Sequence, residues 1–224
     1  MISGWAHPAE CLRPLADALA PAFEPELADA SEGAVCARLQ KAESPLFLFG
    51  WSMGGMIALE AAETWAPRVA GLVLVSSTAK FCPAPGWPNG TPERTVRGMA
   101  ATIRKKPEEL LALFFRNAAS PSELTADELA LKTRSAVSLG MDHLASGLRY
   151  LQLSDCRAAA KALNIPSLVC HGGQDRIIPW QAGRDLGELL SARFAKFDGM
   201  GHDLPLRAPQ ALADEIARFA EAVR

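Results

Sequence analysis

The sequence lacks long hydrophobic runs and has no strong excess of charge. No stretch approaches the roughly 18 consecutive apolar residues of a membrane-spanning helix, and residues 1–5 lack the basic and apolar parts of a signal peptide. The 23 Lys and Arg residues nearly balance the 25 Asp and Glu residues, which leaves a net charge of −2. We therefore expect neither a nucleic acid nor a membrane as a partner.

Cysteine is also scarce, and its spacing argues against two kinds of site. The five cysteines are odd in number, are scattered along the chain and form no C-x-x-C pair, whereas disulfide frameworks and zinc sites need paired or closely spaced ligands. We therefore expect reduced thiols, no metal site and a cytoplasmic location. These cysteines are Cys11, Cys36, Cys82, Cys156 and Cys170.

What the sequence does contain is an alternation of strand and helix patterns. The length of 224 residues and the apolar fraction of 49% fit one α/β domain with a sizeable core. Continuous apolar runs are typical of parallel strands that are covered on both faces, and such runs alternate with helical patterns. The alternation predicts a mostly parallel, doubly wound sheet. Strands are expected at 46–49, 71–75, 166–171 and 193–197, with a brief one near 23–27, and helices at 9–20, 34–42, 56–62 and 180–191 and at the C-terminal end.

A long helical segment interrupts this alternation. Residues 81–90 read as a linker rich in proline and glycine, and residues 91–153 show only helical patterns. Pro92 and Pro107 suit first helical turns, and Thr125 with Glu128 predicts a capping box. We expect a helical lid at 88–155, inserted into a core formed by 1–80 and 160–224.

One serine stands at a sharp turn between a strand and a helix. Residues 50–54 read GWSMG, with Ser52 at the centre, an apolar strand before it and a helix rich in small residues after it. A side chain at Gly50 or Gly54 would strike the neighbouring strand or helix at so tight a turn. The pattern is typical of a nucleophile elbow, which exposes a reactive hydroxyl.

A serine nucleophile needs a general base and a group that orients this base. Of four histidines, His202 lies in a glycine-flanked turn after a late strand and is the favoured base, whereas His171 lies within a strand. His7 lies in an early loop, and His143 falls in a lid helix. Asp175, just after a strand and a Gly-Gly break, is the favoured acid over Asp155 and Asp203.

The oxyanion of an acyl-transfer reaction needs preorganised N–H donors. The backbone N–H of Met53, next to the nucleophile, is one candidate. The backbone N–H of Trp5 is the other, because Gly4 lets this early loop approach the substrate closely. The Trp5 side chain is also free to line the substrate pocket or to pack in the core.

Five stretches together resemble the α/β-hydrolase superfamily and, within it, the pimeloyl-acyl-carrier-protein methyl ester esterases of biotin synthesis. The resemblance lies at 3–5 (SGW), 50–55 (GWSMGG), 75–88 (VSS, then Phe81 and Trp87), 171–179 (HGGQDRIIP) and 201–202 (GH). It implies the α/β-hydrolase fold, with Ser52, Asp175 and His202 in the chain order of that superfamily. Ser3 replaces the usual histidine of the family, and its first strands are missing or shortened here.

The resemblance also implies a function. The family removes a methyl ester from a pimeloyl chain carried on acyl carrier protein, through an acyl-serine intermediate and without a cofactor. Either Phe114 or Phe115 would line the acyl pocket, unless both only pack the lid against the core. Arg94, Arg97 and Arg104 share one face if they lie on one helix, and they would dock the acidic carrier protein or form a solvated surface.

Other functions of the same fold stay open. A carbon–carbon hydrolase, a lactonase or a thioesterase would use similar residues, and a non-catalytic member would bind a small ligand or a carrier protein. An intact set of Ser52, Asp175 and His202 favours the esterase. The sequence leaves the oligomeric state open.

Overall fold

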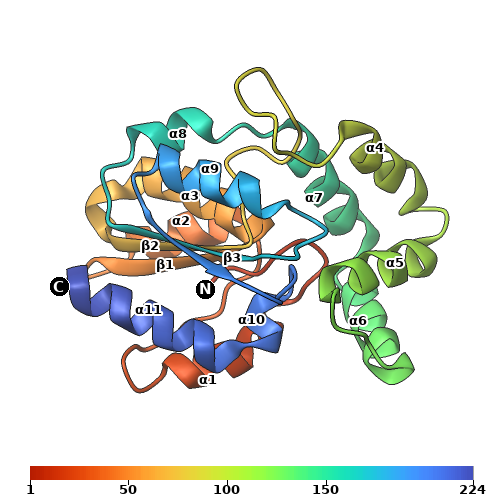
Figure 1. Cartoon of the computed structure of the whole chain (residues 1–224), viewed down its shortest axis with the longest axis horizontal. Helices are drawn as coiled ribbons and strands as arrows, with labels where there is room; N and C mark the ends of the chain where they lie inside the picture. Colours follow the sequence, from red (N-terminus) through yellow and green to blue (C-terminus); the bar gives the residue numbers. More distant parts are fainter. Residues whose placement is uncertain (224) are drawn as a thin grey trace.

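A four-stranded parallel sheet forms the centre of the molecule. The computed structural model describes residues 1–223, and the strands stand in the order β1–β2–β3–β4 (Figure 1). The predicted parallel α/β architecture is thereby confirmed. The strands span Leu46–Trp51 (β1), Val69–Val75 (β2), Ser167–Gly172 (β3) and Arg193–Phe197 (β4).

Helices cover both faces of this sheet. On one side lie α2 (Glu32–Gln40), α3 (Met53–Trp65), α8 (Arg157–Ala162) and α9 (Trp180–Leu189) (Figure 1). On the other side lie α1 (Arg13–Leu19), which follows the short 3₁₀ turn η1 (Ala9–Leu12), and α11 (Pro209–Val223), which follows α10 (Leu204–Arg207). A second 3₁₀ turn, η2 (Ala66–Arg68), joins α3 to β2.

Successive strand residues enter two different cores, because side chains of a strand alternate between its faces. Leu48 and Leu72 pack with α2 and α3, whereas Phe49 and Val73 pack with α1 and α11. Burial on both faces explains why these strands read as continuous apolar runs.

Of the helices between β2 and β3, α4–α7 form a lobe beside the sheet (Figure 1). We call residues 93–153 the helical insertion; the boundaries that the sequence suggests for a lid stay a prediction. The capping box of Thr125 and Glu128 is confirmed at the start of α6. The four helices span Glu93–Thr102 (α4), Pro107–Ala119 (α5), Ala126–Ser138 (α6) and Met141–Leu153 (α7).

The sheet thins out on the far side of β1. Ile2 makes single parallel bridges to Gly50 and to Ala28, and no strand forms at 23–27. The prediction of a brief strand there is wrong. Pro25 lies in this segment, and a proline has no N–H to donate to a strand ladder.

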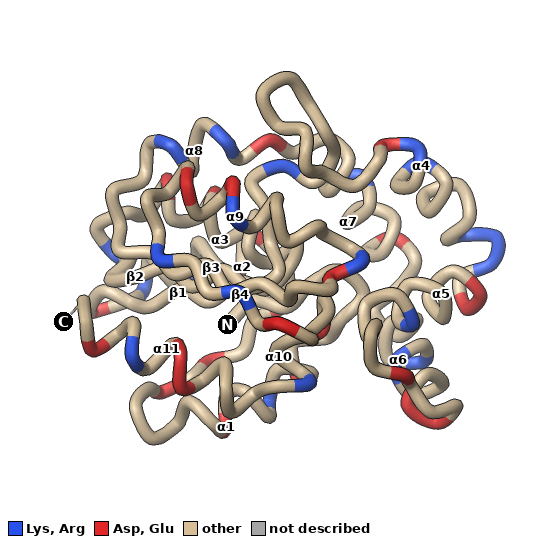
Figure 2. Tube along the Cα trace, viewed as in Figure 1, with Lys and Arg blue, Asp and Glu red and all other residues tan. Residues whose placement is uncertain are grey.

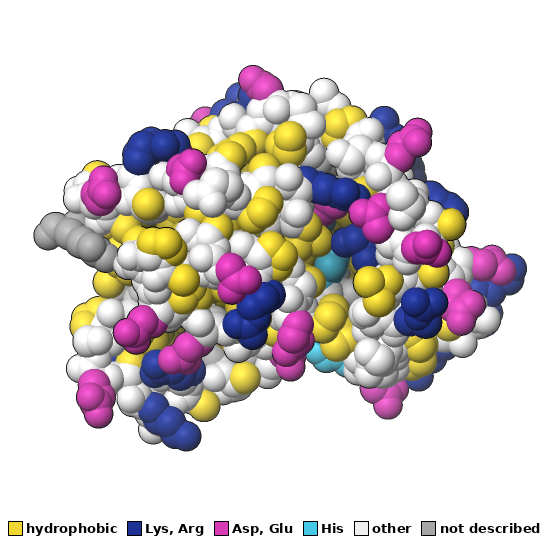
Figure 3. Space-filling model, turned by 90° about the horizontal axis from the view of Figure 1, so that it is seen from below, with side chains coloured by type: hydrophobic (Ala, Val, Ile, Leu, Met, Phe, Trp, Pro, Cys, Tyr) yellow, Lys and Arg dark blue, Asp and Glu magenta, His cyan; other side chains and the backbone are white. Residues whose placement is uncertain are grey.

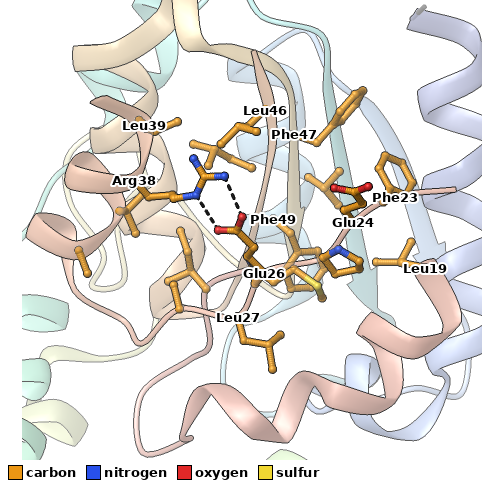
Figure 4. A pocket seen from close by; sticks show the side chains of 18 of the residues that line it. Leu19, Phe23, Glu24, Glu26, Leu27, Arg38, Leu39, Leu46, Phe47 and Phe49 are labelled. Atoms are coloured by element: carbon orange, nitrogen blue, oxygen red, sulfur yellow. Dashed lines mark hydrogen bonds and ion pairs between the residues drawn. The ribbon is translucent and has the colours of Figure 1, made fainter. Parts of the chain in front are cut away.

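A groove of about 740 Å³ follows this edge of the sheet. It is bordered by β1, α2 and the 23–28 segment, and within it Arg38 pairs with Glu26 at 2.6 Å (Figure 4). Ser52, His202 and Asp175 do not line this groove, so it is not where the predicted chemistry lies.

Within residues 1–223, no helix is both long and apolar enough to cross a membrane. All five cysteines are free thiols.

Candidate active site

The turn around Ser52 has the shape of a nucleophile elbow. β1 ends one residue before Ser52 and α3 begins one residue after it, and Ser52 itself has φ 57° and ψ −121°. This is a backbone region that a non-glycine residue rarely adopts. A Cβ atom at Gly50 would collide with the backbone of Gly54, and one at Gly54 would collide with the backbone of Ile2. The two glycines therefore allow the close packing that the elbow needs.

Three residues that are far apart in the sequence form a hydrogen-bonded chain. The Ser52 hydroxyl lies 2.9 Å from His202 Nε2, and His202 Nδ1 lies 2.8 Å from Asp175 Oδ2. Ser52 follows β1, Asp175 follows β3 and His202 follows β4. With the proton on Nδ1, His202 donates to Asp175 and its Nε2 can accept the serine proton. The structure thus brings the serine, base and acid that the sequence suggests into contact.

The carboxylate of Asp175 is fully engaged. Its Oδ1 accepts the backbone N–H groups of Ile177 at 2.7 Å and Ile178 at 2.9 Å. Its Oδ2 lies 3.2 Å from Nε2 of a second imidazole, His171. Burial alone would raise the pKa of Asp175, but the imidazoles of His202 and His171 outweigh it and hold this pKa well below its ordinary value. Asp175 is therefore an anion at neutral pH.

Two side chains hold the loops that carry this chain. The indole N–H of Trp51 donates to the backbone carbonyl of His202 at 2.9 Å, and the Ser77 hydroxyl donates to the carbonyl of Ser52 at 2.7 Å. Trp51 and Ser77 are both completely buried. Each loop is thus fixed by a hydrogen bond from a rigidly packed neighbour.

The early loop passes directly over the serine. A Cβ atom at Gly4 would lie 3.0 Å from Ser52 Cβ and 3.6 Å from its Oγ. Among the residues that the structure describes, the backbone N–H groups of Trp5 and Met53 have no hydrogen-bond acceptor. These two free donors flank Ser52, as an oxyanion hole requires.

The aromatic residues of α5 pack on this loop. Phe114 contacts the Trp5 ring edge-to-face with 4.9 Å between centroids, and Phe115 contacts His7 at 5.2 Å. The Trp5 indole in turn donates to the carbonyl of Leu144 in α7 at 2.9 Å. Phe114 is thus the nearer of the two to the loop above the serine, whereas Phe115 packs deeper.

Four rival candidates, His7, His143, Asp155 and Asp203, take no part in this hydrogen-bonded chain. His7 is buried against the Trp51 ring at 4.3 Å, and burial with nearby Lys132 lowers its pKa. Asp203 pairs with Arg207 at 3.2 Å. The remaining candidates are Asp155, which pairs with Arg157, and His143, which lies on α7.

Seen from below, histidine side chains are visible on this face only in the hollow where the helical insertion meets the sheet domain (Figure 3). The residues Ser52 and His202 are only 6% and 1% exposed, and the side chain of Asp175 is 0% exposed. Only a small part of Ser52 is therefore open to solvent.

The expectation of a single basic helical face is wrong for one of its three arginines. Arg104 lies beyond the end of α4 at Thr102, and it pairs with Asp142 at 2.6 Å. Arg94 and Arg97 do lie on α4, where Arg97 is 3.8 Å from Glu93. The turn between α4 and α5 is basic, and an acidic stretch at the start of α5 follows it (Figure 2).

Sequence reasoning missed several contributors to the site. It set His171 aside because this residue lies within a strand, although its ring reaches Asp175, and it gave no role to the Trp51 indole or the Ser77 hydroxyl. The spacing of four residues between His171 and Asp175, across the Gly-Gly break, was the available signal. It carries little weight without the fold, because i and i+4 side chains meet regularly only in helices.

Comparison with known proteins places this geometry in a family. The sequence matches the family described as serine aminopeptidase, S33, over residues 16–206. It is 29% identical over 243 residues to the pimeloyl-[acyl-carrier protein] methyl ester esterase of Xanthomonas oryzae pv. oryzae (strain MAFF 311018), with 100% of this chain and 94% of that protein covered. It is 30% identical over 222 residues to the protein of the same name from Aromatoleum aromaticum, with coverages of 92% and 81%.

Solved structures share the same fold. The esterase EaEST from Exiguobacterium antarcticum superimposes with a TM-score of 0.88 at 16% identity, and covers 98% of this chain and 91% of its own. A bromoperoxidase from Bacillus anthracis gives a TM-score of 0.83 at 17% identity, with coverages of 98% and 91%. The chain is therefore a hydrolase with the α/β-hydrolase fold, and it belongs to the family described as serine aminopeptidase, S33.

Proposed function

We propose that this protein is a serine carboxylesterase that works through an acyl-serine intermediate on Ser52. The observation that carries the proposal is the hydrogen-bonded chain from Ser52 Oγ through His202 to the buried Asp175, at 2.9 and 2.8 Å. A serine hydroxyl becomes a useful nucleophile only beside such a base.

In the first half-reaction, His202 Nε2 takes the proton of Ser52 as Oγ bonds to the ester carbonyl carbon. The carbonyl oxygen becomes an oxyanion and accepts hydrogen bonds from the backbone N–H groups of Trp5 and Met53. Asp175 stabilises the imidazolium without taking its proton. The tetrahedral intermediate then loses the alcohol, which receives the proton from His202, and the acyl group stays on Ser52.

In the second half-reaction, water takes the place of the alcohol. His202 accepts a proton from the water, whose oxygen bonds to the acyl carbon, and the same two N–H groups hold the new oxyanion. Collapse releases the carboxylic acid and returns the proton to Ser52. The proposed mechanism uses neither a metal nor an organic cofactor.

For the substrate, we propose the methyl ester of a pimeloyl chain carried on acyl carrier protein, in the cytoplasm. The names of the relatives from Xanthomonas oryzae and Aromatoleum aromaticum support this choice. The helical insertion would act as the lid, and Phe114 beside Trp5 would line the acyl pocket, with Phe115 behind it.

Labelling with a fluorophosphonate tests the chemistry. The reagent should modify the wild-type protein at one site, and Ser52→Ala should abolish the labelling, whereas Ser146→Ala at an exposed serine of α7 should leave it unchanged. A protein that resists the reagent, or that is still labelled in Ser52→Ala, would refute the serine mechanism.

A substrate panel tests the specificity. Turnover should be measured on p-nitrophenyl esters, on free dimethyl pimelate and on pimeloyl methyl ester attached to acyl carrier protein. The carrier-bound ester should give the highest kcat/KM, and the gene should restore growth without biotin to a strain that lacks the methyl ester esterase. Labelling at Ser52 without turnover of the carrier-bound ester would keep the mechanism and reject this substrate.

The arginines of the helical insertion provide a separate test of carrier docking. The triple variant Arg94→Glu, Arg97→Glu, Arg104→Glu should lower kcat/KM for the carrier-bound ester and spare small esters, because acidic partners are steered by basic surfaces. Equal loss on both substrates would remove docking from the proposal. Arg104→Glu alone should matter least, since Arg104 already pairs with Asp142.

A further inference from the structure

We infer that His171 is a positioning residue for the proposed reaction, because its imidazole donates to the Asp175 oxygen that holds His202 and so moderates the negative charge that His202 meets. The inference rests on the proposed serine mechanism and adds a fourth side chain to it. It follows from two imidazoles that meet one carboxylate oxygen, Oδ2 of Asp175. His202 Nδ1 donates to this oxygen at 2.8 Å, and Nε2 of His171 lies 3.2 Å from it.

The surroundings of His171 fix which of its nitrogens carries the proton. Nε2 faces two acceptors, the carbonyl of Ile178 at 3.0 Å and Oδ2 of Asp175 at 3.2 Å. Nδ1 is buried and has no partner among the described residues. A buried N–H without an acceptor is costly, so the proton belongs on Nε2, where it is shared between the carbonyl and the carboxylate.

The helix α9 is shaped to admit this ring. A Cβ atom at Gly183 would collide with Nδ1 of His171 and would lie 2.9 Å from its Cε1 and Cγ. The absence of a side chain at this one position leaves room beside the helix for Nδ1 of the imidazole, while Nε2 faces Asp175. Gly187, one turn later in α9, has only ordinary contacts of 3.7–4.0 Å at the same place.

The bond from His171 has a chemical consequence as well as a structural one. Asp175 Oδ1 stays held by two backbone N–H groups whatever happens at His171. Loss of the His171 donor therefore leaves the carboxylate near its position but leaves more negative charge on Oδ2. That charge stabilises the protonated form of His202. The activity should then need a higher pH, since only unprotonated His202 can accept the serine proton.

Two variants with side chains of about equal length separate the loss of the hydrogen bond from a change in packing. His171→Met removes the donor, whereas His171→Gln keeps an N–H at the same distance along the side chain. The rate of fluorophosphonate labelling at Ser52 is measured from pH 5 to 9, so that the result does not depend on knowing the ester. We expect the acid limb of His171→Met to move up by about 0.5–1 pH unit and that of His171→Gln to stay with the wild type.

A second pair of variants covers the case in which His171→Met fails to fold. Gly183→Ala should displace the imidazole and move the acid limb in the same direction, whereas Gly187→Ala should not. An unchanged acid limb in the folded His171→Met and in Gly183→Ala would overturn the inference, even if both proteins were less stable. If the wild type itself is not labelled, the serine mechanism fails; if it is labelled but does not cleave the carrier-bound ester, only the substrate proposal fails.

Discussion

Replacement of Trp51 by phenylalanine should damage both stability and activity, because this indole ties the His202 loop to the elbow strand. Trp51 is completely buried, and its Nε1–H donates to the His202 carbonyl at 2.9 Å. The variant keeps an aromatic ring at the elbow but leaves that carbonyl without its partner.

The size of the effect follows from the two losses. A buried carbonyl left without its donor costs about 1–3 kcal/mol. The smaller ring also leaves a cavity, which adds about 1 kcal/mol by comparison with other reductions of core volume. We expect Trp51→Phe to lower the free energy of unfolding by about 2–4 kcal/mol. A catalytic group that shifts by a fraction of an ångström loses about tenfold or more in kcat.

Trp87→Phe is the matched control. The Trp87 indole is also buried and donates to a backbone carbonyl, that of Lys80, at 3.0 Å. Urea unfolding and ester turnover are measured for both variants. Both should lose stability, but only Trp51→Phe should lose turnover. Equal activity in the two folded variants would refute the idea that the Trp51 indole positions the His202 loop.

Three further outcomes are expected. Thr125→Ala removes the capping box of α6 and should cost about 1 kcal/mol in urea unfolding. Gly147→Ala would place a methyl group 2.6 Å from Cδ1 of Trp5; by disturbing a proposed oxyanion donor it should lower kcat about tenfold or more with less change in KM. The folded-state pKa of Asp175 is depressed, so its contribution to stability is present above the unfolded value of about 3.9 and is lost as the pH falls through the folded value. The unfolding free energy of Asp175→Asn, measured in urea from pH 6 to 3, should therefore fall less than that of the wild type.

Each of these outcomes has a check. Ser31 begins α2 without a side-chain capping bond, so Ser31→Ala should cost clearly less than Thr125→Ala, and equal costs would contradict the capping argument. Gly98 in α4 has nothing within 4 Å of a Cβ atom, so Gly98→Ala should keep full activity. Parallel pH curves for Asp175→Asn and the wild type would show that the interactions of the carboxylate do not stabilise the fold.

The elements and the reactive residues were predictable for a common reason. β4 is found at the predicted residues 193–197 and α9 within two residues of its predicted end, because strands and helices of an α/β fold have distinct apolar patterns. Ser52, Asp175 and His202 each follow a strand, and the carboxyl ends of parallel strands meet at one edge of the sheet. Their proximity thus follows from the strand pattern.

The errors came from places where one residue overrides a pattern. The arginines of the insertion read as one helix, but Pro107 disfavours helical backbone at the residue before it. The chain turns at Thr102, whose carbonyl accepts the N–H groups of Lys105 and Lys106, and Arg104 leaves the face of α4. The contact between His171 and Asp175 depends on how tightly the turn after β3 closes, which local sequence does not determine.

Side-chain N–H groups explain how loops on a parallel sheet acquire the accuracy that catalysis needs. The strands bring the serine, acid and base to one edge, but hydrogen bonds within the sheet end where the loops begin. Beyond that point, Trp51 holds the carbonyl of His202, His171 holds the carboxylate of Asp175, and Trp5 is held by the carbonyl of Leu144. Each donor is a rigid ring in a packed environment, so little conformational freedom is left to lose when the bond forms. The Trp5 bond differs from the other two because its acceptor lies in the helical insertion. Movement of α7 would therefore disturb a proposed oxyanion donor while the Ser52–His202–Asp175 chain stayed intact.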